Sequence, residues 1–201
     1  MKKTKEEAQL TKKQIIEKAV ELFIAKGFSN TTLDEIAKQT NNTRGAIYWH
    51  FKDKLDIVNE LIESQHESLT QLLTDLFSND PPSFNKIKLI IEELVSHFYE
   101  TKSFQNFIEL TWFKIEYTQL ANLKTTKTEL TTYFINSFRD LVKEVQNAGE
   151  IKKEINAMDV AITITNMVNG MYRLFFILKD QSNSKEQVKQ SFSSYLKLIK
   201  S

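Results

Sequence analysis

The chain has no cysteine, two prolines and four glycines among its 201 residues. The lack of cysteine excludes disulfide bonds and thiolate metal sites. Proline and glycine are the residues that most strongly interrupt helices, so their scarcity predicts long helices. The hydrophobic share of 41% and the charged share of 26% are typical of a folded domain and argue against a disordered chain.

A targeting segment and a membrane span are also missing from the pattern. Residues 1–7 lack the apolar run of a secretory signal. The most apolar stretch, residues 160–178, is interrupted by Asn166, Asn169 and Arg173, whereas a membrane span needs about 20 largely apolar residues. We therefore expect a cytoplasmic protein that does not enter the membrane.

The net charge of +1 hides a difference between two parts of the sequence. Residues 1–54 hold eleven Lys and Arg against seven Asp and Glu, whereas residues 55–201 hold sixteen against nineteen. A basic segment joined to a mildly acidic one is expected of a nucleic-acid-binding domain attached to a domain with another role, although solvated surface charge gives the same imbalance. We predict domains at 1–54 and 55–201.

Apolar residues recur at helical spacing along nearly the whole chain, which predicts an all-α fold of about nine helices. The first helix is expected between Thr11, as its N-cap, and Gly27. Two short helices follow, and then a long one with an apolar stripe from Val58 to Leu76. The remaining helices are expected at about 84–101, 103–119, 122–148, 157–178 and 185–199.

The two short helices have the pattern of a helix-turn-helix. Thr32 and Glu35 form the T-x-x-E pattern of a capping box at the start of the first of them, which runs to about Thr40. Asn41 and Asn42 provide the turn, since Asn adopts left-handed backbone more readily than most residues. The second short helix spans about 43–49. In a helix-turn-helix this second helix lies in the major groove of DNA.

Residues 11–61 closely resemble the DNA-binding domain of the TetR family of bacterial repressors. The matching segments are A-x-x-L-F-x-x-x-G-F at 19–28, T-T-L-D-E-I-A at 31–37 and T-R-G-A-I-Y-W-H-F-K-x-K at 43–54. The resemblance implies an N-terminal three-helix DNA-binding domain, followed by a C-terminal helical domain that binds an effector and dimerises. The chain departs from the family at the turn, where Asn42 replaces an aliphatic anchor.

The chemistry of these residues assigns roles at DNA. Arg44 is the candidate for a bidentate contact to guanine, worth about 1–3 kcal/mol of discrimination, and Thr43 presents the positive helix N-terminus to a phosphate. Small residues at the helix start allow close approach, aromatic residues pack on the backbone as the resemblance implies, and lysines neutralise phosphates. The full predicted set is Lys12, Thr32, Thr43, Arg44, Gly45, Ala46, Tyr48, Trp49, His50, Lys52 and Lys54.

Several of these residues have a structural alternative. Tyr48 is at least partly a core residue in one reading, and Trp49 is an exposed aromatic residue without a partner in another. His50, Lys52 and Lys54 can equally be ordinary surface residues. Phe51, next to them, is expected in the core.

The last two helices are candidates for a dimer interface, as the resemblance implies. The helix at 157–178 is apolar nearly all round, which is expected when it is covered on two sides. Together with the last helix it can form a symmetric four-helix interface with a second copy. The predicted interface residues are Met171, Leu174, Phe175, Leu178, Val188, Phe192, Tyr195, Leu196 and Ile199. The alternative is that these residues pack only within one chain.

The middle of the chain is dense in aromatic residues, which favours a small, apolar or aromatic effector. Glu116, if it faces inward, selects a cationic one. The predicted pocket residues are Phe98, Phe107, Trp112, Phe113, Glu116, Tyr117, Tyr133, Phe134, Phe138, Asn166 and Met167. The alternative reading places most of these aromatics in the core.

Two other classes of protein are less consistent with the sequence. An enzyme is disfavoured because the three histidines are scattered and no phosphate loop, nucleophile elbow or paired metal ligands occur. A soluble carrier leaves the motif at 43–54 unexplained. We therefore predict a regulator with double-stranded operator DNA, a small-molecule effector and a second copy as partners, and with no catalytic residue, metal or cofactor.

Overall fold

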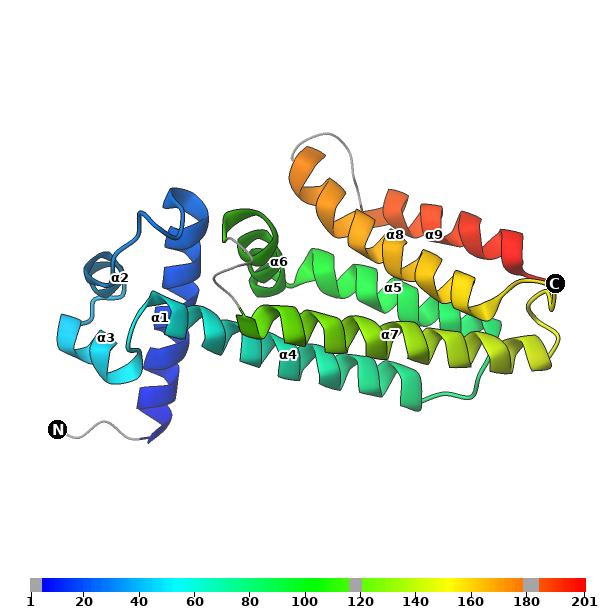
Figure 1. The fold of residues 1–201 in the computed structure, drawn as a ribbon, viewed down its shortest axis with the longest axis horizontal. Coiled ribbons are helices and arrows are strands. Elements are labelled where there is room, and N and C mark those ends of the chain that lie inside the picture. The colour runs from blue at the N-terminus through cyan, green and yellow to red at the C-terminus, as the bar shows by residue number, and fades with distance from the viewer. Residues whose placement is uncertain (1–4, 116–120, 179–184) are drawn as a thin grey trace. The chain divides into compact units, whose positions relative to one another are not determined.

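The computed structural model describes residues 5–115, 121–178 and 185–201. Within these residues the fold is all-α, as predicted, and the only extended pairing is an isolated bridge between Ile151 and Lys200. The helices, shown in Figure 1, are α1 (Lys5–Lys26), α2 (Leu33–Gln39), α3 (Arg44–His50), α4 (Lys54–Ser78), α5 (Phe84–Glu100), α6 (Lys102–Glu109), the π-helical turn η1 (Leu110–Lys114), α7 (Ala121–Asn147), α8 (Ala157–Leu178) and α9 (Lys185–Ile199).

The chain divides into two compact units. The first, here called the N-terminal unit, comprises Met1–Glu67 and Ser103–Thr126, and the second, here called the bundle unit, comprises Ser68–Lys102 and Lys127–Ser201. Helices α4 and α7 each contribute to both units. These units are defined by contacts within the chain, whereas the predicted domains 1–54 and 55–201 are defined by function. The functional division stays a prediction.

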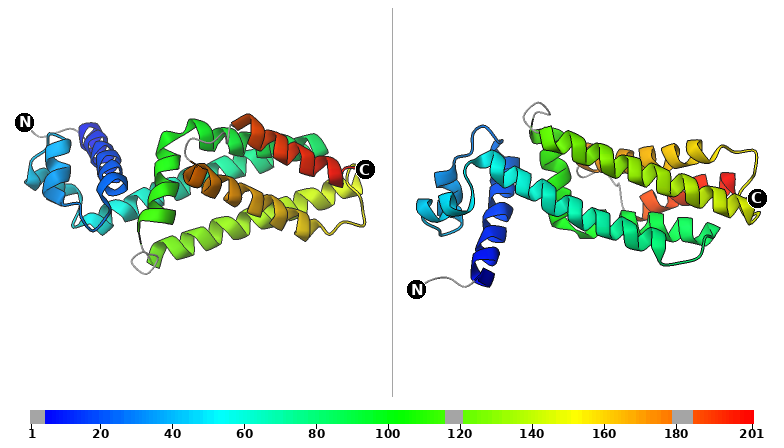
Figure 2. Two further views of the ribbon diagram at one scale, coloured as in Figure 1. Left: turned by 90° about the horizontal axis from the view of Figure 1, so that it is seen from above. Right: turned by 60° about the horizontal axis from the view of Figure 1, so that its bottom comes forward.

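In the N-terminal unit, α1 packs against α2 and η1, and α2 packs against α3. The core between these helices contains Ile15, Phe23, Ile36 and Ile47, all fully buried. Ile15 and Phe23 come from α1, and each short helix contributes one residue. Burial of these side chains therefore holds α3 in place through α2. Figure 2 shows the two short helices beside α1.

Helix α1 begins earlier than predicted. Thr11 is not its N-cap but a buried residue inside it, and its hydroxyl donates to the carbonyl of Glu7 at 2.8 Å. The residues before Thr11 include Glu, Ala, Gln and Leu, which are good helix formers, so the helix continues toward the N-terminus.

The predicted helix at 103–119 is shorter and less regular in the structure. It is α-helical over Lys102–Glu109 and continues as the π-helical turn η1. Thr111 contributes to this change because its hydroxyl donates to the carbonyl of Phe107 at 2.8 Å, a bond that competes with the regular helix ladder. Residues 116–119 of the prediction lie outside the described residues.

The bundle unit is built from the second half of α4 with α5, α7, α8 and α9, and α5 packs against α9 (Figures 1 and 2). By length and composition α8 would be able to cross a membrane. However, Val160, Ile164 and Val168 on this helix are buried within the folded chain. We therefore assign α8 to the core of the bundle.

Candidate nucleic-acid interface

Helix α3 is short, capped and exposed on one side. The Thr43 hydroxyl accepts a hydrogen bond from the amide of Ala46 at 3.1 Å, which makes Thr43 the N-cap. Ile47 is fully buried and Phe51, which ends the helix, is 1% exposed. These two anchors turn the opposite face outward, where Trp49 is 72% exposed.

The turn between α2 and α3 has the predicted conformation. Asn41 has a φ of 51°, the left-handed region. The amide of Asn42 donates to the carbonyl of Ala37 at 2.9 Å, and its side-chain amide donates to the carbonyl of Thr40 at 3.1 Å. Hydrogen bonds to the end of α2 thus replace the apolar anchor that Asn42 lacks.

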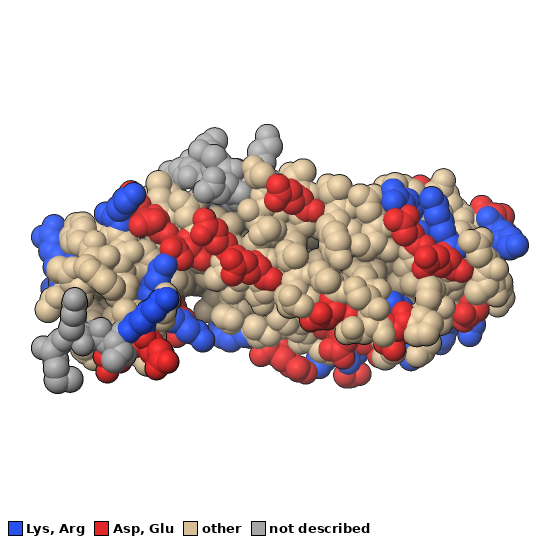
Figure 3. Space-filling model, turned by 90° about the horizontal axis from the view of Figure 1, so that it is seen from below, with Lys and Arg blue, Asp and Glu red and all other residues tan. Residues whose placement is uncertain are grey.

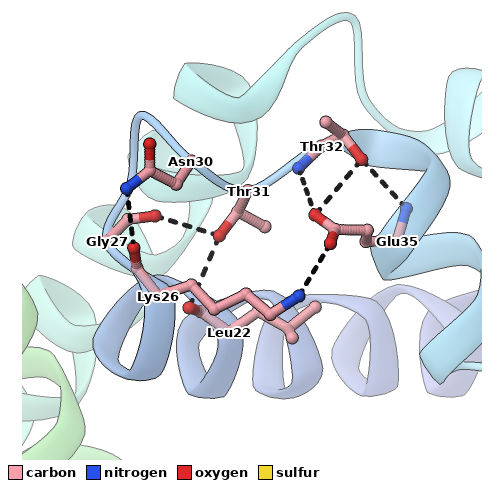
Figure 4. A network of polar contacts seen from close by, with 7 residues as sticks. All are labelled: Leu22, Lys26, Gly27, Asn30, Thr31, Thr32 and Glu35. Carbon is pink, nitrogen blue, oxygen red and sulfur yellow. Dashed lines mark hydrogen bonds and ion pairs between the residues drawn. The ribbon is translucent and has the colours of Figure 1, made fainter.

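Helix α2 is held on α1 by a polar network, drawn in Figure 4. Thr32 and Glu35 form the predicted capping box. Glu35 also pairs with Lys26 of α1 at 2.7 Å, and this hydrogen bond with those from Thr32 lowers the pKa of the Glu35 carboxyl. The buried Thr31 hydroxyl is 3.0 Å from the carbonyl of Gly27, to which it donates. The network therefore fixes Thr32 at the surface.

The Arg44 side chain lies on the exposed face between two partners. Its Nε is 3.2 Å from a carboxylate oxygen of Asp34, and its Nη2 donates to the Tyr48 hydroxyl at 3.4 Å. The hydrogen bond to Tyr48, and then the charge of Asp34, raise the pKa of Arg44. Asp34 was not among the predicted site residues, because ten residues separate it from Arg44 and only the fold brings them together.

Two predicted phosphate contacts have partners within the protein. Lys12 of α1 pairs with Glu60 of α4 at 2.5 Å. Lys54 donates to the carbonyls of Phe28 and Ser29 at 2.6 and 3.3 Å, which ties the start of α4 to the end of α1. Their ammonium groups thus hold the N-terminal unit together, a role that spacing alone did not reveal.

The other predicted DNA-contacting residues lie at the surface. Thr32, Thr43, Gly45, Tyr48 and Lys52 are exposed, and Ala46 and His50 are half-buried. The His50 ring meets the Trp49 ring edge-on, with centroids 4.5 Å apart. On the face drawn in Figure 3, Lys and Arg side chains border an uncharged surface of the N-terminal unit.

The predicted effector-binding residues fall into separate clusters. In the bundle unit, Phe134 and Phe138 lie with Phe77, their ring centroids 4.8 to 6.4 Å apart. Phe98 lies in a second cluster, where its centroid is 4.7 Å from that of Tyr172. Burial in the bundle raises the pKa of Tyr172 and lowers that of Lys127 to about 8.

The remaining predicted pocket residues are more dispersed. In the N-terminal unit Phe107 stacks on Phe104 with centroids 6.2 Å apart. Several others reach the surface: Asn166 is exposed, Phe113 and Tyr133 are 42% and 40% exposed, and Trp112 and Met167 are half-buried. Glu116 and Tyr117 lie outside the described residues.

The predicted dimer residues divide into two groups. Five of them are buried within the single chain: Met171, Val188, Phe192, Leu196 and Ile199. Phe175 and Tyr195 are half-buried. Leu174 and Leu178 are 47% and 37% exposed and lie on α8 near Ile177, which is 57% exposed.

A short exposed helix, held by two others through a tight turn, defines a DNA-binding protein of the helix-turn-helix class. Residues 15–61 match the family described as bacterial regulatory proteins, tetR family. The chain is 30% identical over 185 residues to the HTH-type transcriptional regulator TtgR of Pseudomonas putida, covering 90% of this chain and 87% of that one. The chain therefore belongs to the TetR family and is a DNA-binding transcriptional regulator, not an enzyme.

Solved structures share the whole fold. NalD, described as the secondary repressor of the MexAB-OprM multidrug efflux pump in Pseudomonas aeruginosa, superposes with a TM-score of 0.76 at 21% identity, covering 98% of each chain. SmeT of Stenotrophomonas maltophilia, in its complex with triclosan, gives a TM-score of 0.74 at 17% identity and covers 94% of this chain and 90% of that one. At these identities the two structures show a shared fold and not shared individual residues.

Proposed function

We propose that this regulator is a cytoplasmic repressor that binds a palindromic operator as a homodimer and is released by a small apolar or aromatic effector. The observation that carries the proposal is the exposed face of α3, where Arg44 and Trp49 project from a helix anchored by the buried Ile47. Tyr48 and Trp49, 48% and 72% exposed, leave two neighbouring aromatic side chains uncovered on this helix, and a partner that covers them supports the proposal.

At the operator, each residue of α3 has a distinct role. Thr43 and the first amides of the helix bind a phosphate at the positive end of the helix dipole, and Arg44 donates to a guanine edge. A Cβ added to Gly45 would meet only the Thr43 hydroxyl, at 3.9 Å. The protein's own packing therefore leaves room for a side chain here, and close approach to DNA accounts for the glycine.

In this proposal the homodimer forms through the exposed apolar face of α8. The proposed interface residues are therefore those of α8 that the single chain leaves at the surface. Ile162, Leu174 and Ile177 are 40%, 47% and 57% exposed and recur at helical spacing along one side of α8. Leu198 of α9 is also exposed, at 70%. A two-fold dimer places two copies of α3 about 34–36 Å apart, one turn of duplex.

The effector is assigned by chemical class. The aromatic clusters around Phe98 and around Phe138 give the bundle unit apolar walls, with the hydroxyl of the buried Tyr172 as a polar group. SmeT, which shares the fold, is known in complex with triclosan, a small aromatic molecule. A cationic effector would require Glu116, which lies outside the described residues.

The proposal is tested by selecting binding sites from random duplexes and comparing Arg44→Ala with the wild type. We expect the wild type to enrich a palindrome. The substitution should reduce the preference for that palindrome over a shuffled duplex by about 10- to 100-fold for each of the two bidentate base contacts that the homodimer loses. Binding would be measured by fluorescence anisotropy at several salt concentrations, because affinity quoted at one concentration is not interpretable.

Lys38→Ala is the matched control, since Lys38 is an exposed cation of the preceding helix. Lys38→Ala is expected to weaken binding to the selected and to the shuffled duplex by about the same factor. A wild-type protein that enriches no sequence would contradict the proposal. An Arg44→Ala variant with an unchanged preference would remove Arg44 from base reading.

A further inference from the structure

Asp34 and Arg44 form an ion pair across the two helices of the motif. Asp34 is the second residue of α2 and Arg44 the first of α3, and the distance from Nε to the carboxylate oxygen is 3.2 Å. The two side chains are 53% and 66% exposed. Ion pairs this exposed contribute little to folding stability. Asp34 also lies in the first turn of α2, where a carboxylate favours the helix dipole, but neither effect requires the contact with Arg44.

The pair leaves Arg44 with a defined orientation. A guanidinium group is planar and carries five N–H donors in a fixed fork. Asp34 engages Nε, the Tyr48 hydroxyl accepts from Nη2 at 3.4 Å, and the guanidinium carbon lies 5.4 Å from the centroid of the Tyr48 ring. These contacts leave the N–H groups of Nη1 and the second N–H of Nη2, the two-nitrogen end that a bidentate base contact needs, and a long flexible side chain has fewer conformations to lose on binding.

The negative charge of Asp34 also lowers the affinity of the protein for duplex DNA of any sequence. It lies within 3.2 Å of the cation that the motif presents, so it offsets part of the attraction of Arg44 for any phosphate backbone. A guanine at the correct position recovers this loss through the oriented fork, whereas a wrong base does not. Specific binders often combine such an attractive element with a repulsive one.

We propose that Asp34 is a specificity-determining positioning residue, which orients the Arg44 fork toward a base and lowers the affinity for non-cognate DNA. The inference rests on the proposed function, because it assumes that Arg44 reads the operator. It extends that function to a residue of α2, the helix that the motif does not place in the groove.

The experiment compares Asp34→Ala and Asp34→Asn with the wild type in full-length protein. The probes are the duplex selected by the wild type and a shuffled duplex of the same composition, titrated at several salt concentrations. For Asp34→Ala we expect tighter binding to the shuffled duplex and a preference for the selected duplex reduced by about tenfold, the range of one base contact. Asp34→Asn removes the charge while keeping the size of the side chain, so it should lose the charge interaction with Arg44 as Asp34→Ala does and also bind the shuffled duplex more tightly.

Two further variants test whether the effect of Asp34→Ala comes from positioning Arg44, from the loss of a negative charge or from local unfolding. Glu63→Gln removes one exposed negative charge from α4, about 14 Å along that helix from its start, and should leave the preference unchanged. In an Arg44→Ala background, Asp34→Ala should change the preference less than twofold, because a positioning residue has nothing left to position. A loss of preference caused only by local unfolding would persist in that background.

The outcomes are distinguishable. If the wild type selects no duplex, the proposed function fails and this inference fails with it. If the wild type is selective and Asp34→Ala behaves like Glu63→Gln, only the inference is overturned. The inference is also overturned if Asp34→Ala reduces the preference by the same factor with and without Arg44.

Discussion

At the scale of single residues, Lys86 shows how a charged side chain is accommodated inside the protein. It is only 5% exposed, and its ammonium donates to the carbonyl of Phe77 at 2.7 Å and to that of Asp80. Phe77 lies in the last turn of α4, where carbonyls lack helical partners and the helix dipole is negative. Lys86 of α5 thus serves as a C-terminal cap for the preceding helix.

We predict that Lys86→Met lowers the free energy of unfolding by about 2 kcal/mol, since two charge-assisted hydrogen bonds to carbonyls are lost. Urea denaturation followed by circular dichroism would measure it. Lys88→Met, two residues along α5, removes an exposed pair with Glu92 at 3.6 Å and should cost less than about 0.5 kcal/mol. Equal effects of the two substitutions would show that Lys86 caps nothing.

At the scale of the element, the helix ends marked by a glycine or a capping box were predicted from local sequence, whereas the starts and ends without such a residue were not. Gly27 and Gly149 have φ values of 89° and 81°, and each follows a helix, α1 and α7. The left-handed conformation is free of steric cost for glycine alone, and it reverses the chain after a helix. The α2 capping box and Asn41 follow the same logic, because each depends on neighbours within a few residues.

For the end of α7 we predict a graded effect of substitutions. A Cβ built at Gly149 meets no atom within 4 Å, so Gly149→Ala should destabilise the protein by about 1 kcal/mol through backbone conformation alone. Gly149→Asn should cost clearly less, because Asn tolerates left-handed backbone. Thermal unfolding of the three proteins would give the order. An alanine variant as stable as the wild type would mean that the turn adopts another conformation in solution.

At the scale of the whole molecule, the proposed dimer depends on side chains that the single chain leaves uncovered. The apolar side of α8 that carries Leu174 and Ile177 is exposed, whereas most of the predicted stripe of α9 is already buried within the chain. In a two-fold interface each residue occurs twice, so a single substitution acts on both halves of the contact.

We therefore predict that Leu174→Arg converts the dimer to a monomer. Burying an unpaired charge at the centre of an interface should weaken association by at least about 100-fold, and sedimentation velocity at micromolar concentration would detect it. Helical content should be unchanged, and preference for a palindrome over a single half-site should disappear. Leu89→Arg on α5, where Leu89 is 45% exposed, is the control. A Leu174→Arg protein that sediments like the wild type would place the interface elsewhere.

The features determined by the sequence itself were those with local causes. The helical period predicted an all-α chain, the T-x-x-E pattern predicted the capping box of α2, and Asn41 predicted the turn before α3. The motifs between residues 15 and 61 also identified the family, because the match depends on the order of residues along one segment.

Only the tertiary structure decided which partner each long side chain has. Lys12 pairs with Glu60, 48 residues away, and Lys54 donates to the carbonyl of Phe28, so two predicted phosphate ligands also have partners within the chain. Met171 of α8 and Phe192 of α9 are buried within the chain because other segments of the fold cover them. The helical period shows on which face of a helix a residue lies. Which segment covers that face depends on parts of the chain far away in the sequence.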